Sequence, residues 1–343
     1  MEKLNLVYGN DYYDKIQALA DGIVRPEGIT VTSVRMNAQE LFYRLLKYDE
    51  YDFAEMSFSS FIIAKTKRLR DWIAIPVFPL RMFFHSRIVC NKNSNIRNPV
   101  DLKGKRFGIP EYQMSLGLWT RAALEHDYGV HPKDVTWYVE RTQELSHAGA
   151  SSFKDPTGVS IRQIDPTKNL GEMLINGELD AANGVSIKSK LDRSHAFSVR
   201  TNPNVAYLFP DPEKAAHDFF KNHGFAPANH VVIIKKQLYE KHPWVAESLY
   251  QAFEESKKVW YDRWRYMMEI NYQHPEVARI TSLLNIQEIW NRQKQLFGED
   301  VSPYGFERNK NLILEEINCL QEQELIPYKP TVEELFAPNT LDT

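Results

Sequence analysis

The sequence contains only two cysteines, Cys90 and Cys319, and they do not form a Cys-x-x-Cys pair. Two isolated cysteines cannot build a disulfide framework or a cysteine-rich zinc cluster, so we expect both to be buried free thiols. The chain also has no uninterrupted apolar run of about 18 residues and no signal-peptide pattern in its opening residues. We therefore expect a cytoplasmic protein that does not insert into membranes.

Neither sign of charge predominates, since 42 Lys and Arg residues stand against 45 Asp and Glu residues, for a net charge of −3. Without an excess of positive charge, nucleic acid is not an expected partner. The sequence also lacks a Walker loop, a Gly-x-Gly-x-x-Gly stretch and a Gly-x-Ser-x-Gly elbow, which argues against nucleotide, dinucleotide and α/β-hydrolase chemistry. With 343 residues, the chain is long enough for two domains of about 150 residues each.

An internal repeat is the most informative pattern in the chain. The spacing Val-x-Pro-x-x-(Ile/Val)-Thr occurs at 24–30 and again at 130–136, each time as a turn that leads into a strand. After each copy, a helix is predicted to begin, at Asn37 and at Asn169, with a glutamate three residues later as in a capping box. A further strand follows each helix. Both halves are therefore predicted to repeat the order strand, helix, strand, helix, strand.

Units of this kind form parallel sheets covered by helices, so the predicted fold class is α/β with two similar lobes. Each lobe is expected to be a mostly parallel sheet flanked by helices. Apolar, extended stretches at 75–89 and 226–234 suit crossings between the lobes, which assigns 1–88 plus 231–343 to the first lobe and 89–230 to the second. Ligands of open α/β sheets bind beyond the carboxyl ends of the strands, so the cleft between the lobes is the expected site.

Three strand-to-helix segments reach this cleft by the same reasoning, at 9–14, 55–60 and 110–115. Hydroxyl groups and backbone N–H groups at a helix N-terminus can hold an anion, and carboxylates there can exchange a proton. The same residue types also serve as ordinary helix caps. The candidate residues in these segments are Tyr12, Asp14, Glu55, Ser59, Ser60, Glu111, Tyr112, Gln113, Met114 and Ser115.

A fourth segment places Arg81, His85 and Arg87 two or four residues apart on a stretch that we predict to be extended. Alternate residues of an extended chain point to the same side, so the three side chains are expected to project together. Arginine matches the planar geometry of a carboxylate, and histidine can exchange a proton near neutral pH. We interpret the segment as a carboxylate-binding site, and a solvent-facing hinge with ordinary salt bridges is the alternative.

His230 lies in the predicted return strand, where burying an idle histidine would be costly. It is either a functional group at the cleft or a hydrogen-bonded core histidine. A metal set of His217, His223 and His230 lacks the His-x-x-x-His and His-Glu-x-x-His spacings, so we expect no metal ligation.

Motifs spread over nearly the whole chain carry a family resemblance. They are Tyr12-Tyr13-Asp14, Pro26-Glu27-Gly28 and the segments 55–60, 74–79, 108–114, 242–245 and 303–305. Together they resemble the 4,5-dihydroxyphthalate decarboxylase family, from about Leu4 to Pro338. That family is similar to a cytoplasmic branch of the type 2 periplasmic-binding-protein-like fold, which agrees with the two lobes predicted from the repeat.

The resemblance implies decarboxylation of 4,5-dihydroxyphthalate, or a close analogue, to protocatechuate and CO2, with no cofactor. A carboxylate can leave from a ring with a para hydroxyl once the ring carbon that bears it is protonated. The candidates for the proton transfers are His85, His230, Glu55 and Glu111. The candidates for holding the remaining carboxylate are Arg81, Arg87, Ser59 and the N–H groups of 113–115.

The alternative on the same fold is a non-catalytic solute-binding component of an ABC transporter, specific for an aromatic or other carboxylate. Only this alternative requires a membrane permease as partner. A third possibility, a precursor-synthesis protein with a pyridoxal-binding lysine, has no local motif here, since Lys235 and Lys236 are expected to be a solvated strand end. In the main reading the partner is a small aromatic carboxylate, and a homo-oligomer stays open.

Overall fold

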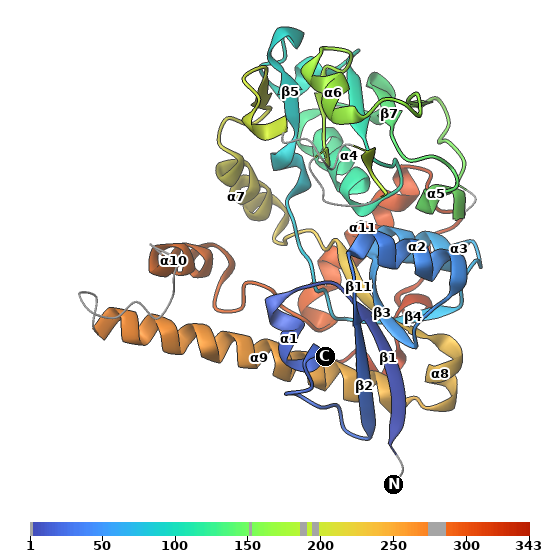
Figure 1. Ribbon diagram of the computed structural model, residues 1–343, viewed down its shortest axis with the longest axis vertical. Helices are drawn as coiled ribbons and strands as arrows, with labels where there is room; N and C mark the ends of the chain where they lie inside the picture. Colours follow the sequence, from blue (N-terminus) through green and yellow to red (C-terminus); the bar gives the residue numbers. More distant parts are fainter. Residues whose placement is uncertain (1–2, 151–152, 186–190, 194–198, 274–285) are drawn as a thin grey trace.

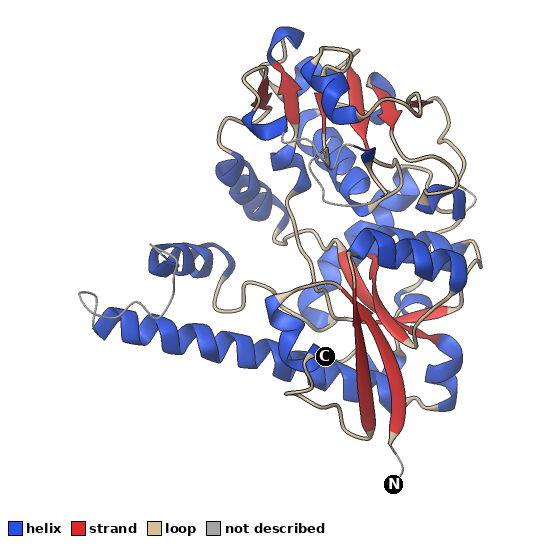
Figure 2. Cartoon of the chain, viewed as in Figure 1, coloured by secondary structure: helices blue, strands red, loops and turns tan. Residues whose placement is uncertain are grey.

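The computed structural model describes residues 3–150, 153–185, 191–193, 199–273 and 286–343. Its strands form two separate sheets with helices around each, and the chain passes between the two bodies (Figures 1 and 2). The two-lobe α/β architecture predicted from the internal repeat is therefore confirmed.

The first sheet has five strands in the order β2-β1-β3-β11-β4. Its strands are β1 (Leu4–Asn10), β2 (Ile29–Arg35), β3 (Phe53–Ser57), β4 (Trp72–Ile75) and β11 (His230–Lys235). The helices of this body are α1 (Gln17–Ala20), α2 (Ala38–Tyr48), α3 (Phe58–Thr66), α8 (Lys236–Lys241) and α9 (Trp244–Gln273). β1 pairs in parallel with β2 and β3, whereas β11 runs antiparallel between β3 and β4.

The second sheet has six strands in the order β10-β5-β9-β6-β7-β8. Its strands are β5 (Val89–Asn91), β6 (Arg106–Ile109), β7 (Thr136–Val139), β8 (Ser160–Gln163), β9 (Ala181–Ala182) and β10 (Val205–Tyr207). The helices are α4 (Ser115–Tyr128), α5 (His147–Ala150), α6 (Leu170–Ile175) and α7 (Pro212–His223). β6 is parallel to β7 and β9, whereas β5 is antiparallel to β9 and β10.

The repeat is visible in the strand order, because β2-β1-β3-β11 of the first sheet has the counterpart β7-β6-β9-β5 in the second. Asn37 and Asn169 cap the equivalent helices α2 and α6 through their side-chain oxygens, as the sequence predicts. In each sheet the antiparallel member of this set, β11 or β5, is a strand that has just crossed from the other body. The sheets are therefore mixed, and less uniformly parallel than expected.

The connection at 75–89 differs from the expected strand. β4 ends at Ile75, and after an irregular stretch the chain forms a 3₁₀ helix, η2 (Phe84–Arg87), before β5 begins. In a helical turn, residues two apart do not face the same side, so the three polar side chains of this segment do not project together. Packing decides this conformation, because Phe84 and His85 are both buried. The residue boundaries of the two lobes stay predictions.

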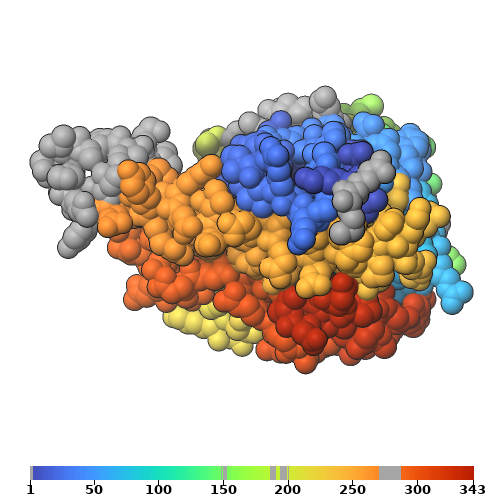
Figure 3. Space-filling model, turned by 90° about the horizontal axis from the view of Figure 1, so that it is seen from below, coloured from blue at the N-terminus to red at the C-terminus, as the bar shows by residue number. Residues whose placement is uncertain are grey.

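The C-terminal region adds α10 (Ile286–Phe297), α11 (Lys310–Glu322) and α12 (Val332–Leu335). The far half of α9 extends beyond the body of the first sheet (Figures 1 and 3). α11 contacts both α3 of the first body and α4 of the second, so it links the two. None of the described helices is both long enough and apolar enough to cross a membrane.

Candidate functional site

A pocket of about 260 Å³ lies where the two bodies meet. Its walls come from the loop after β1, the N-terminus of α2, the connection at 80–87, the start of α4, the end of β9 and the start of β11. The lining residues are Asp11, Tyr13, Asn37, Ala38, Gln39, Leu80, Met82, Phe84, Arg87, Leu116, Asn183, Gly184, Asn229 and His230. The pocket is thus polar on several sides, at the place that the duplicated fold predicts for a ligand.

His230 contacts polar side chains through both of its ring nitrogens. The residue is 1% exposed, and Nδ1 lies 3.2 Å from Oε2 of Glu55. The Asn229 amide nitrogen lies 2.9 Å from Nε2, and the edge of the Phe42 ring packs on the imidazole. Nδ1 thus faces the Glu55 carboxylate and Nε2 faces the Asn229 side chain, so both ring nitrogens are oriented. This arrangement holds the imidazole in one position at the pocket wall.

Glu55 is fully buried beneath His230, on β3. Its other oxygen, Oε1, accepts a hydrogen bond from the backbone N–H of Asp11. The strand register brings β11 against β3, with Val232 opposite Glu55, and so places the two side chains together. Glu55 and His230 therefore form a buried carboxylate–imidazole pair at the pocket wall.

The Tyr13 hydroxyl lies 3.1 Å from the same Nδ1 of His230. Burial, and then the nearby Glu55 carboxylate, raise the pKa of Tyr13 well above its ordinary value, so the hydroxyl stays protonated at neutral pH. Tyr13 is therefore a hydrogen-bond donor at the pocket. Its neighbour Tyr12, the residue predicted from the sequence, is 70% exposed and does not line the pocket.

The two arginines of the fourth candidate segment have different environments. Arg87 lines the pocket, and within the described part of the chain its guanidinium has no hydrogen-bond or ion-pair partner. Arg81 is directed to the backbone instead, donating to the carbonyl oxygens of Ala226 at 3.0 Å and Pro303 at 2.7 Å. Burial lowers the pKa of Arg81 to about 10. Arg81 therefore ties the crossing segments together, and Arg87 is the cation available to a ligand.

His85 lies away from the pocket, between η2 and α7. Its ring packs on Phe209 and Phe219, and Nε2 is 3.3 Å from the carbonyl oxygen of Ala215. Burial lowers the pKa of His85, so the imidazole is neutral at neutral pH. This placement resembles a hydrogen-bonded core histidine, and it separates His85 from His230.

Glu111 belongs to a buried ionic network in the second body. It accepts from Arg141 Nη1 at 2.6 Å, from Ser146 Oγ at 3.0 Å and from the backbone N–H of His147 at 3.1 Å. Burial opposes ionisation of Glu111, but the charges of His147 and Arg141 outweigh it and lower its pKa. Because burial lowers the pKa of His147 itself, Arg141 is the permanent cation of the network.

The same network reaches the pocket through Arg141. Its Nη2 donates to the side chain of Gln39 at 2.9 Å, and Gln39 lines the pocket. Arg141 also holds Asp192 by two hydrogen bonds. Glu111 therefore positions an arginine that joins the two bodies. The side chains of Glu111, Tyr112 and Gln113 line a different pocket, of about 480 Å³, on the second body.

A group of serines makes a second junction between the bodies. Ser59, at the start of α3, accepts at its hydroxyl from Ser115 Oγ at 3.0 Å and donates to the carbonyl oxygen of Gln113 at 3.0 Å. Ser57 Oγ lies 3.1 Å from Ser115 Oγ. The sequence suggested Ser59 and Ser115 for binding an anion, but in the structure their hydroxyl groups hydrogen-bond to each other.

The remaining candidates lie outside the pocket. Asp14 is exposed and accepts from the backbone N–H of Lys15, and Met114 is buried at the N-terminus of α4. Tyr112 is buried under the guanidinium of Arg121, 3.6 Å from its ring centre. Ser60 is buried, and its hydroxyl has no partner among the described residues.

Sequence reasoning did not single out Asp11, Tyr13, Gln39, Asn183 and Asn229 as site residues, although the segment 9–14 that it placed at the cleft contains the first two. Asp11 and Tyr13 are sequence neighbours of Tyr12 and Asp14, the residues predicted from this loop. The prediction therefore misses the pocket-lining residues by one position. Asn229 directly precedes His230, and this polar pair at the start of an apolar strand was the available signal. No local sequence pattern marks Gln39 or Asn183 as pocket residues.

Comparison with known proteins identifies relatives of the same name, one of them over the full chain. The sequence is 32% identical over 343 residues to a 4,5-dihydroxyphthalate decarboxylase from Comamonas testosteroni, covering 100% of this chain and 99% of that protein. It is 35% identical over 221 residues to a protein of the same name from Pseudomonas putida, covering 64% of this chain and 83% of that protein.

A family model described as "ABC transporter, phosphonate, periplasmic substrate-binding protein" matches residues 8–152. Among solved structures, the chain is similar to the periplasmic aliphatic sulphonate binding protein SsuA from Escherichia coli, with a TM-score of 0.54, 13% identity and 100% coverage of both chains. It is similar to the desulfurization enzyme DSZB, with a TM-score of 0.54, 14% identity and coverage of 99% and 98%. At such identities these structures show the fold alone, which is that of periplasmic solute-binding proteins.

The Glu111 network predicts a pH-dependent contribution to stability. The folded-state pKa of Glu111 lies below its unfolded value, so the ionised network stabilises the fold above the unfolded pKa and loses this effect as the pH falls. Glu111→Gln is expected to lower the free energy of unfolding at neutral pH by about 3 kcal/mol, because Arg141 loses a buried partner. The difference from wild type should shrink as the pH falls from 4.5 toward about 2.

Urea unfolding at neutral and acidic pH measures this difference. Glu178→Gln is the matched control, because Glu178 pairs with Lys168 on the exposed surface. An Glu111→Gln variant that is as stable as the control at neutral pH would contradict the assignment.

Proposed function

Because the chain belongs to the 4,5-dihydroxyphthalate decarboxylase family, whose named members are carboxy-lyases, we propose that it decarboxylates 4,5-dihydroxyphthalate or a close analogue in the pocket between the two bodies. The observation that carries the proposal is the buried Glu55–His230 pair at a pocket wall that also holds Arg87, whose guanidinium is unpaired among the residues that the structure describes. A proton donor and a carboxylate-binding cation are the two groups that this reaction requires.

Arg87 supplies the positive charge for the carboxylate that remains on the ring. Asn183 lies in the same pocket wall, where its amide donates to the Phe84 carbonyl oxygen at 2.9 Å and to Thr120 Oγ1 at 3.0 Å, so it shapes the wall. The pocket volume, about 260 Å³, lies just below the range of about 300 to 1,000 Å³ for ligand pockets, which suits a ligand no larger than one substituted ring.

The proposed step moves two protons and breaks one carbon–carbon bond. Asp11, which lines the pocket, takes the proton of the hydroxyl para to the leaving carboxylate. His230 takes up a proton from solvent and gives it to the ring carbon that bears that carboxylate. The bond to the carboxylate then breaks, CO2 leaves, and the bonding electrons restore the aromatic ring. Asp11 returns its proton to the para oxygen, which has supplied and recovered the electrons, so the ring needs no separate electron sink.

Glu55 acts on this step through His230. Its carboxylate stabilises the imidazolium before the proton is transferred, and its hydrogen bonds to Asp11 and His230 hold both groups at the pocket. The junctions made by Ser59 with Ser115 and by Gln39 with Arg141 keep the bodies together, which limits water in the pocket.

The test is to incubate the purified protein with 4,5-dihydroxyphthalate, with and without a chelator, and to follow protocatechuate and CO2 by chromatography. Product in the presence of chelator is expected. The absence of product, together with a ligand-dependent rise in melting temperature, would favour the binding-only alternative, a solute-binding component of an ABC transporter. The family model that matches residues 8–152 is the observation in favour of that alternative.

His230→Gln is expected to lower kcat by about 100- to 10,000-fold with little change in KM, because it removes a general acid but leaves the pocket shape. His85→Gln is the matched comparison, since His85 is also buried but packs against α7. Steady-state kinetics on both variants, with melting temperatures as a check of folding, measure the effect. If the His85 variant loses turnover and the His230 variant keeps it, the proton donor is His85.

Arg87→Ala is expected to raise KM by about 10- to 100-fold, because a charge-assisted hydrogen bond to a carboxylate contributes about 1.5 to 3 kcal/mol. The control is Arg97→Ala, which changes an exposed arginine outside the pocket. Initial rates over a range of substrate concentrations measure KM. An unchanged KM in the Arg87 variant would remove this residue from the site.

A further inference from the structure

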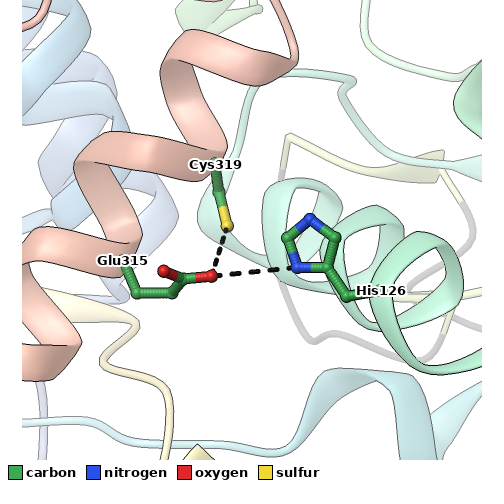
Figure 4. Close-up of side chains that lie close together, drawn as sticks. All are labelled: His126, Glu315 and Cys319. Atoms are coloured by element: carbon green, nitrogen blue, oxygen red, sulfur yellow. Dashed lines mark hydrogen bonds and ion pairs between the residues drawn. The ribbon is translucent and has the colours of Figure 1, made fainter.

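A cluster of three potential metal ligands lies outside the proposed active site, where α4 of the second body packs against α11. His126 comes from α4, and Glu315 and Cys319 come from one face of α11 (Figure 4). His126 Nδ1 and Cys319 Sγ are each 3.8 Å from Oε1 of Glu315. One ligand atom from each residue lies within 4.8 Å of the other two. Nitrogen, oxygen and sulfur atoms thus converge at one point.

The second nitrogen of His126 is already held by a carboxylate. Nε2 lies 3.0 Å from Oε2 of Glu322, which orients the ring when Nε2–H is the donor. Nδ1 is then an acceptor that faces the Glu315 carboxylate, another acceptor, at a separation longer than a hydrogen bond. Two acceptors facing each other leave room for a cation between them. A histidine whose far nitrogen donates to a carboxylate is the usual arrangement of a metal ligand.

The charge around this cluster favours a cation as well. Within the described part of the chain, neither Glu315 nor Glu322 forms an ion pair with a lysine or an arginine.

We propose that His126, Glu315 and Cys319 bind a zinc ion that joins α4 to α11. Zinc accepts this mixture of imidazole, carboxylate and thiolate, whereas magnesium and calcium prefer oxygen ligands alone. The ion takes the place of the Cys319 proton, which passes to solvent, and water occupies the fourth position. Zinc–sulfur and zinc–nitrogen bonds of about 2.3 and 2.0 Å need the ligand atoms slightly closer together than they are here.

The consequence is structural, because α11 also contacts α3 of the first body. A zinc ion would fasten α11 to the second body and thereby hold the two bodies together. The site does not involve the pocket of His230, so the proposal does not depend on the proposed function.

The test uses Co²⁺ as a spectroscopic probe of the apo protein and Zn²⁺ in competition with a chromophoric chelator. The wild type is expected to bind one equivalent of Co²⁺, with a near-ultraviolet thiolate-to-metal band that Zn²⁺ removes, and to melt at a higher temperature with Zn²⁺. Cys319→Ser and His126→Gln should lose the band, whereas Cys90→Ser, which changes the other buried cysteine, should keep it. Glu322→Gln should weaken Zn²⁺ binding by about 10- to 100-fold.

Absence of the thiolate band in the wild type would overturn the proposal, and so would its persistence in Cys319→Ser. If the Cys319 and His126 variants fail to fold, Glu315→Gln decides the matter, because this side chain is 30% exposed and its loss leaves the core intact. Zn²⁺ affinity and melting temperature that are unchanged in Glu315→Gln would also overturn it.

Discussion

The structure of the pocket depends on one buried interaction, the Glu55 carboxylate held between the Asp11 backbone N–H and His230. A carboxylate with no exposed surface is stable only when donors surround it, so β1, β3 and β11 must come together at this point. The donors arrive from an adjacent parallel strand and from the antiparallel strand that returns from the second body. The interaction that stabilises the centre of the first sheet therefore also positions the proposed proton donor.

The two bodies are joined by polar contacts around that pocket. Ser59 pairs with Ser115, and Arg141 reaches Gln39 across the junction. In the fold of periplasmic solute-binding proteins, the residues at this junction decide whether a ligand is held or transformed, since the fold itself accommodates both. Here the junction includes a buried histidine–carboxylate pair and an arginine that has no ion-pair partner in the described ranges, which is the composition expected of a site for acid–base chemistry on a carboxylate.

Local patterns predicted much of the fold. Asn37 and Asn169 were identified as helix caps because capping depends on a side chain and on N–H groups two or three residues away. The repeated turn and strand implied two similar bodies, and the strand orders match. The segment from Arg81 to Arg87 was predicted wrongly as extended, because its conformation follows from the burial of Phe84 and His85 against residues far along the chain.

By itself, the sequence determined the α/β class, the duplication, the two buried thiols and the family, since each rests on neighbouring residues or on similarity along the chain. Only the tertiary structure decided which candidates meet. It joined Glu55 to His230, directed Arg81 to backbone carbonyls, and left Arg87 at the pocket. It also brought His126 beside Cys319, although neither has a metal-binding motif around it. Such pairs depend on strand register and helix packing, and no local spacing encodes the distance between atoms so far apart along the chain.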